Sequence, residues 1–173
     1  MNAIYDRLLP MLSDSYQFLH QKAKGKLIIA QVQIKNEKIS DSKETLNDAL
    51  LNIIRAIKLA EQVPEARNIK ETLLHMVYTK GRILIACCCN SVKYVPQAVD
   101  TCYELYHMQQ NIRHDAYDYA TGSGNDKYLF EKFKNILITN KRVHGFDDLD
   151  IEKTEFLLNH WTGRNFRIIK KKH

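Results

Sequence analysis

The chain has 173 residues and a mass of 20.2 kDa, enough for one compact domain or for one domain with an appendage. It is 45% hydrophobic and 27% charged, which excludes whole-chain disorder, collagen and low-complexity sequence. No apolar run approaches the ~18 residues of a membrane span, no signal peptide is evident, and the four cysteines favour a reducing compartment. We therefore expect a cytoplasmic protein without a membrane partner.

The net charge of +6 is concentrated at the C-terminus. The last twelve residues carry five Lys and Arg and no Asp or Glu, so the rest of the chain is nearly neutral. A second basic cluster, Lys22, Lys24 and Lys26, surrounds Gly25. Such clusters favour an anionic partner. The alternative interpretation is a solvated surface that aids solubility.

Apolar residues recur at helical spacing from the beginning of the chain. Residues 4–19 predict a helix that is kinked at Pro10 or begins next to it. Residues 27–35 fit the alternation of a strand and the spacing of a helix equally well, and we favour a helix because no partner strand is evident nearby.

The next helix has a clear predicted start and the most regular apolar stripe of the chain. Asp41 is placed to cap the helix and Glu44 to reach back to it, as in a capping box. The predicted stripe has the spacing of one buried helix face. It consists of Leu46, Ala49, Leu50, Ile53, Ile57 and Ala60.

Two prolines mark the starts of two further helices. Pro64 fits the first turn of a helix that ends near Asn90, and Pro96 opens another. Residues 121–126 form the strongest break in the sequence. A short helix and a last helix that ends at Gly163 follow the break.

These elements predict an all-α fold: an antiparallel up-down bundle of about four long helices with a smaller C-terminal helical appendage and a basic tail. The expected boundaries are residues 1–120 for the helical bundle, 121–163 for the appendage and 164–173 for the tail. We find no internal repeat of 20 to 50 residues.

Cys87, Cys88 and Cys89 are the most conspicuous candidates for chemistry. Three consecutive side chains on a helix point in directions about 100° apart and cannot all face one metal ion. Zinc sites usually use spaced cysteine pairs, and none exists here. We interpret the cysteines as small apolar residues at a helix interface and expect no metal site, no cofactor and no catalytic residue.

A nuclease is the weakest of the alternatives. Helical toxin ribonucleases of the HEPN type pair Arg with His roughly five residues apart on one helix, and neither His114 nor His144 has an arginine at that spacing.

The basic tail also contains an aromatic residue. Phe166 stands between Arg164 and Arg167, and Lys170 follows. An aromatic ring can stack on bases while neighbouring cations contact phosphates. Binding through several phosphate contacts depends steeply on salt concentration.

The middle of the chain resembles the Avd-type four-helix-bundle accessory proteins of diversity-generating retroelements. The resemblance rests on a helix ending in Ile54-Arg55-Ala56, a turn with Arg67, a helix with Arg82, the stretch Lys93-Tyr94-Val95, and a last helix reaching Arg113. It covers roughly residues 46–115, and residues 121–173 have no counterpart. It implies a non-enzymatic partner of a reverse transcriptase that forms a basic homo-oligomeric barrel, typically a pentamer, and binds the polymerase and template RNA.

Together these observations predict a non-catalytic nucleic-acid-binding accessory protein, with RNA preferred to DNA, beside a reverse transcriptase or in a ribonucleoprotein complex. A tetratricopeptide-like protein–protein adaptor and a small helical subunit of a larger nucleic-acid-guided complex are the alternatives. The predicted binding residues are basic except for Phe166. The basic segments supply Lys22, Lys24, Lys26, Arg164, Phe166, Arg167, Lys170, Lys171 and Lys172, and the family resemblance implies Arg55, Arg67, Arg82, Lys93 and Arg113.

Overall fold

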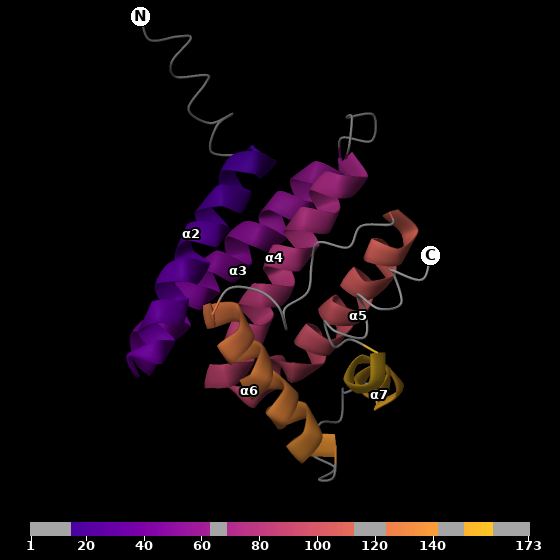
Figure 1. The fold of residues 1–173 in the computed structure, drawn as a ribbon. Helices are drawn as coiled ribbons and strands as arrows, with labels where there is room; N and C mark the ends of the chain where they lie inside the picture. The colour runs from indigo at the N-terminus through magenta and orange to yellow at the C-terminus, as the bar shows by residue number, and fades with distance from the viewer. Residues whose placement is uncertain (1–14, 63–68, 113–123, 142–150, 161–173) are drawn as a thin grey trace, which may run out of the picture. The chain divides into compact units, whose positions relative to one another are not determined.

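The computed structural model confirms that the protein is an all-α helical bundle (Figure 1). It describes residues 15–62, 69–112, 124–141 and 151–160, and all regular structure in these segments is helical. The elements, in chain order, are α2 (Tyr16–Lys35), α3 (Ile39–Glu61), α4 (Ile69–Asn90), the short 3-10 helix η1 (Val92–Tyr94), α5 (Val95–Ile112), α6 (Gly124–Lys141) and α7 (Ile151–His160).

The chain divides into two compact units within α4. The first unit is Met1–Lys80 and the second is Gly81–His173. Compactness therefore groups α6 and α7 with α5, whereas the sequence suggested a boundary at residues 121–126. Most of that expected boundary lies outside the described residues, so the division into bundle, appendage and tail stays a prediction.

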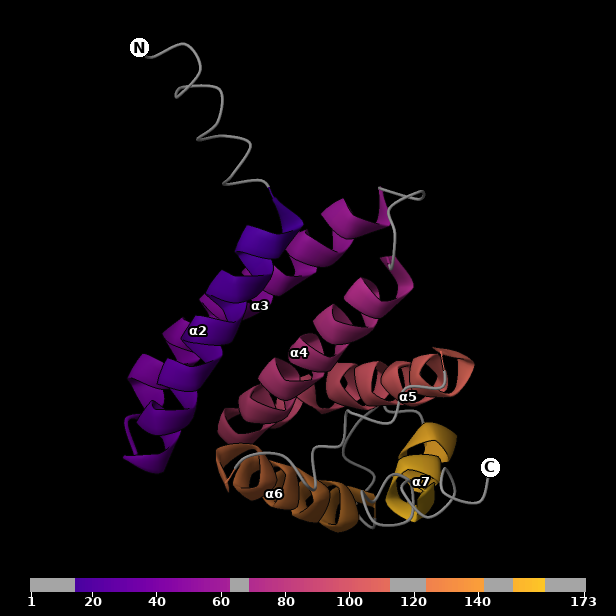
Figure 2. The ribbon, with the colours of Figure 1, turned by 45° about the horizontal axis from the view of Figure 1, so that its top comes forward.

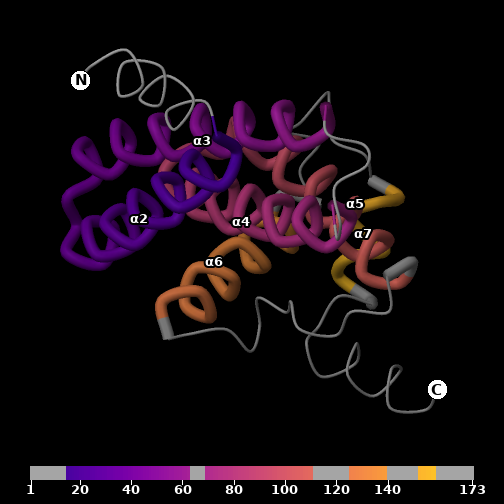
Figure 3. The backbone as a smooth tube through the Cα atoms, turned by 90° about the horizontal axis from the view of Figure 1, so that it is seen from above, coloured from indigo at the N-terminus to yellow at the C-terminus, as the bar shows by residue number. Residues whose placement is uncertain are grey.

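In the first unit, α2 and α3 form a helical hairpin whose arms run side by side (Figures 1 and 3). Ala23 and Ala30 of α2 and Ala49 and Ala56 of α3 are all fully buried. Small side chains allow two helices to approach closely, and larger ones such as Leu27 fill the space between them. Residues 27–35, which fitted a helix and a strand equally well, lie within α2, so the choice of helix is confirmed.

A left-handed cap joins α2 to α3. Glu37 has a φ of 61°. Its N–H donates to the Ile34 carbonyl at 3.0 Å, and the N–H of Lys38 donates to the Gln33 carbonyl at 2.8 Å. These two bonds satisfy carbonyls that the end of a helix leaves without partners. The chain is thereby turned directly into the first residue of α3.

The capping box predicted for α3 is wrong. The helix begins at Ile39 with Lys38 as its N-cap, and no side chain makes a capping hydrogen bond. Asp41 lies inside the first turn, where its charge complements the helix dipole. The cap at the end of α2 fixes the entry into α3, so the helix starts earlier than the side-chain pattern suggested.

In the second unit, α7 lies beside α5 (Figure 2), and a cluster of aromatic side chains attaches the two helices. The Phe156 ring lies edge-on to the rings of Tyr103 and Tyr106, with centroid distances of 5.2 Å and 5.0 Å. It also stacks with His107 at 5.9 Å. Edge-to-face pairs of this kind are favourable beyond the apolar area they bury. Cys102 of α5 is fully buried.

The other predicted helix ends are partly described. The helix predicted to end near Asn90 does end there, and α5 begins at Val95 with Pro96 in its first turn. Pro10, Pro64 and Gly163 lie outside the described residues.

We predict that Glu37→Gly stabilises the protein. Glycine adopts a positive φ without the steric cost that a Cβ atom imposes, so the free energy of unfolding should rise by roughly 0.5–1 kcal/mol. Lys38→Gly is the matched control because Lys38 has a φ of −85°, where glycine only adds freedom to the unfolded chain. Urea denaturation of both variants tests this, and a loss of stability in Glu37→Gly would contradict it.

Candidate functional site

One face of α2 forms the inner wall of the first unit. Its buried residues recur at helical spacing and are all apolar except His20 and Gln31. They are Leu19, His20, Ala23, Leu27, Ala30, Gln31 and Ile34. This face contacts α3 along the hairpin and fixes which side of α2 remains outside.

A buried hydrogen bond ties α2 to α4 within the first unit. His20 Nε2 lies 2.8 Å from the Thr79 hydroxyl oxygen. The Thr79 hydroxyl donates to the His75 carbonyl at 3.1 Å, so it accepts from an N–H at His20 Nε2. Buried polar groups need such partners because an unsatisfied one costs about 1–3 kcal/mol. The bond therefore favours one rotational setting of α2.

The opposite side of α2 is also apolar. We call Phe18, Gly25, Ile28, Ile29 and Val32 the outer face of α2. Its four large side chains are between 47% and 56% exposed. At about 100° per residue, all its members except Ile28 fall within an arc of roughly 60°. Single exposed apolar residues are common, whereas four large ones on one side of a helix form an apolar patch.

Lysines border this outer face on both sides. Lys22 and Lys26 follow one edge at helical spacing, Lys24 and Lys35 follow the other, and α2 contains no Asp or Glu. Lys26 Nζ lies 3.3 Å from an Asp48 carboxylate oxygen of α3. Both side chains are partly exposed, and such ion pairs contribute little to stability. The surface of α2 is thus basic and apolar at once.

The other predicted nucleic-acid-binding residues do not all join this surface. Arg55 is exposed on α3 in the first unit. Lys93, in the second unit, is exposed with its ammonium group 5.1 Å from the centre of the Tyr94 ring. Arg82 is largely buried, and its Nε donates to Asp126 at 3.1 Å. Its charge is therefore balanced by a carboxylate where α4 meets α6.

More than half of the predicted binding residues lie outside the described residues. They come from the segment before α4, the segment after α5 and the C-terminal tail. They are Arg67, Arg113, Arg164, Phe166, Arg167, Lys170, Lys171 and Lys172.

The cysteines are held in the neutral thiol form. Burial raises the pKa of Cys87 to about 12 and that of Cys89 to about 11, and it also raises the pKa of Cys88 and Cys102. The Cys89 thiol donates to the Ile85 carbonyl at 3.5 Å. Because the thiolate is the reactive and metal-binding form, these thiols are poor nucleophiles at neutral pH. Within the described segments, no group of three or more His, Cys, Asp and Glu residues is arranged to hold a metal ion.

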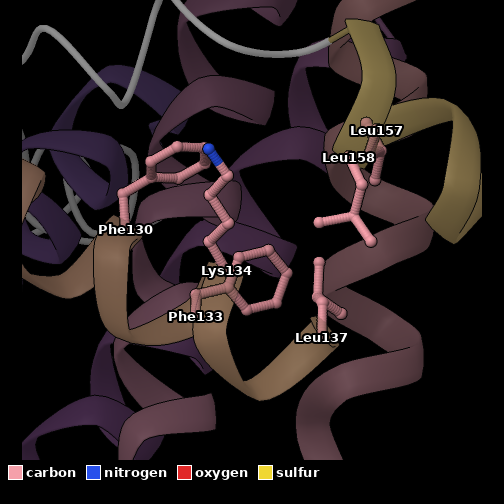
Figure 4. Close-up of a pocket in the computed structure, with 6 residues that line it drawn as sticks. All are labelled: Phe130, Phe133, Lys134, Leu137, Leu157 and Leu158. Carbon is pink, nitrogen blue, oxygen red and sulfur yellow. The ribbon is translucent and has the colours of Figure 1, made fainter. Parts of the chain in front are cut away.

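A small apolar pocket lies between α6 and α7 (Figure 4). It is lined by Phe130, Phe133, Lys134, Leu137, Leu157 and Leu158. Its volume of about 10 Å³ leaves room for roughly one water molecule. This is far below the several hundred Å³ of typical ligand sites, so the pocket is a packing feature and not a substrate site.

No family model, curated protein or solved structure matches the chain. The resemblance to the Avd-type accessory proteins therefore stays a prediction. Among the helices that the structure describes, none combines the length and the apolar content needed to cross a membrane.

The sequence analysis identified the lysines of α2 but missed its outer face. The ambiguous pattern of residues 27–35 was a sign of this face. Ile28, Ile29 and Val32 stand between buried apolar residues, so the apolar spacing does not match that of a helix with one buried side. A helix that is apolar on two opposite sides has no single stripe from which its buried face can be read.

We predict that the cysteines make stability fall at alkaline pH. The folded-state pKa of Cys87 is about 12 and its reference value is 9.0, so the folded state retains a proton that the unfolded state loses above pH 9. Stability from this thiol is fully present below pH 9 and is lost as the pH rises toward 12.

The test compares urea denaturation of the natural protein and Cys87→Ala at pH 8 and pH 10. The stability advantage of the natural protein should shrink by about 1.4 kcal/mol over this range, because the unfolded thiol ionises. Comparing the two proteins cancels the titration of Lys and Tyr. An advantage that is independent of pH would contradict the prediction.

Proposed function

We propose that this protein is a non-catalytic nucleic-acid-binding protein. The proposal is carried by α2, which has four lysines and no acidic residue on a helix whose inner face is firmly packed. Phosphate groups supply most of the affinity in sequence-independent nucleic-acid binding, and they are recognised by exposed cations.

The lysines of α2 suit contact with phosphates more than recognition of bases. Lys22 is exposed and Lys24 partly exposed, and each presents a flexible point charge. Lys26 is close enough to Asp48 for its charge to be partly balanced in the free protein. We assign Lys22 and Lys24 the main role on this helix, and Lys26 a smaller one.

The basic tail adds a second set of contacts in the proposal. Five Lys and Arg within twelve residues, together with Phe166, provide charge for phosphates and a ring that can stack on a base. RNA as the preferred nucleic acid, a reverse transcriptase as partner and a homo-oligomeric state rest on the family resemblance alone.

We predict that Lys22→Gln/Lys24→Gln weakens binding to single-stranded RNA and flattens its salt dependence. Each phosphate contact contributes a slope of about −0.7 in a plot of log K against log salt, so the slope should become smaller by about 1.4. Fluorescence anisotropy with a labelled RNA across a salt series measures this.

Removal of residues 162–173 should reduce the slope by about 3.5, since it deletes five cations.

The matched control is Lys43→Gln/Lys58→Gln, which removes two exposed lysines from α3 and leaves α2 intact. It has the same change in net charge, so a purely global effect of charge would alter both variants equally. Equal slopes for the two double variants would contradict a role for α2. If the full chain does not bind RNA at low salt, the proposed function is overturned.

A further inference from the structure

The outer face of α2 is not explained by binding to nucleic acid. Lys22 and Lys24 can contact phosphates. The exposed aliphatic side chains of Ile28, Ile29 and Val32 offer neither charge nor hydrogen bonds to a phosphate or a base. Several large apolar side chains left half-exposed on one side of a helix are typical of a surface that another protein covers.

Gly25 lies at the centre of this row. Phe18 and Val32 are each seven residues away from it, so the three positions share one side of the helix. A Cβ atom added to Gly25 would meet none of the described residues within 4 Å, and the glycine does not have a positive φ. A glycine inside a helix is destabilising relative to alanine. Neither packing against the described part of the chain nor backbone conformation accounts for the glycine, whereas close approach of a second helix would.

The charges on α2 indicate which helix fits. A second copy of α2 would bring lysines against lysines, because the helix contains no acidic residue to offset them. In an antiparallel pair centred on Gly25, Lys24 of one copy would face Lys26 of the other. A helix with Asp and Glu beside its apolar stripe would place opposite charges along both edges.

We propose that the outer face of α2 binds an amphipathic helix of a partner protein whose apolar stripe is bordered by acidic residues. The apolar side chains supply the buried contact, Gly25 allows the two backbones to approach, and the lysines select the sign of the partner's charge. This interaction is separate from nucleic-acid binding, since it depends on Ile29 and Gly25 and not on the lysines alone.

The test uses a phage-displayed library of helices about three heptads long. Leu is fixed at the two apolar heptad positions, and Glu, Lys, Gln and Ala are allowed elsewhere. Selection on the immobilised full chain should enrich helices with net negative charge at least tenfold. Ile29→Ser should abolish the enrichment. Leu51→Ser, which alters an exposed leucine on α3, should leave it within twofold and serves as the matched control.

Gly25→Ala adds a readout that separates binding from folding. We expect its Tm to rise by a few degrees, because alanine favours the helix, while enrichment of the acidic helices falls. A lower Tm would show that the glycine serves the fold of this chain and would contradict its assignment to the partner.

Other results would overturn the proposal. Enrichment of neutral or basic helices, no enrichment, or equal enrichment on Ile29→Ser would each contradict it. Dimerisation in sedimentation velocity that Ile29→Ser abolishes would assign the face to a second copy. Cosedimentation with phosphatidylserine–phosphatidylcholine vesicles that Ile29→Ser abolishes would assign it to a lipid surface. RNA binding measured on the same variant distinguishes these outcomes from failure of the proposed function, because Ile29→Ser retains every lysine.

Discussion

The rotational setting of α2 determines which of its side chains are buried and which are exposed. Because the helix is apolar on two opposite sides, burial of apolar area alone does not decide which side faces inward. Two features decide it: Ala23 and Ala30 permit close contact with α3, and His20 forms a buried hydrogen bond with Thr79 of α4. If α2 were rotated, His20 would lose this partner and the glycine of the outer face would replace alanine in the interface. The setting in turn exposes Ile29 and its neighbours.

Two kinds of contact are therefore available on one rigid helix. The lysines provide charge that acts over several ångströms and is screened by salt, whereas the aliphatic side chains act only on contact and are insensitive to salt. A nucleic acid would contact the lysines, whereas a partner helix would contact the lysines and the aliphatic side chains. Because the lysines are shared, the two partners would compete where they meet Lys22 or Lys24.

Much of the fold could be predicted from the sequence, because the apolar period of helices such as α3 is regular and Asn90 is a clear helix end. The start of α3 could not, because it is set by the backbone cap at Glu37 and not by the capping-box pattern at Asp41, and that cap depends on a positive φ in a residue that rarely adopts one. Arg82 was predicted as a binding residue from the family resemblance, but it pairs with Asp126, which is distant in sequence. The outer face of α2 was missed because apolar residues on two opposite sides of one helix leave no single apolar side that the spacing in the sequence can reveal.

The most direct test of the setting of α2 compares Leu27→Asp and Ile29→Asp by urea denaturation. The two residues are two positions apart on the same helix, but Leu27 is fully buried and Ile29 is 54% exposed. We expect Leu27→Asp to lose at least about 3 kcal/mol of stability or to fail to fold, because it places a carboxylate in the core. Ile29→Asp should change stability by less than about 1 kcal/mol. Comparable losses in both variants, or tolerance of Leu27→Asp, would contradict the assignment of the inner and outer faces.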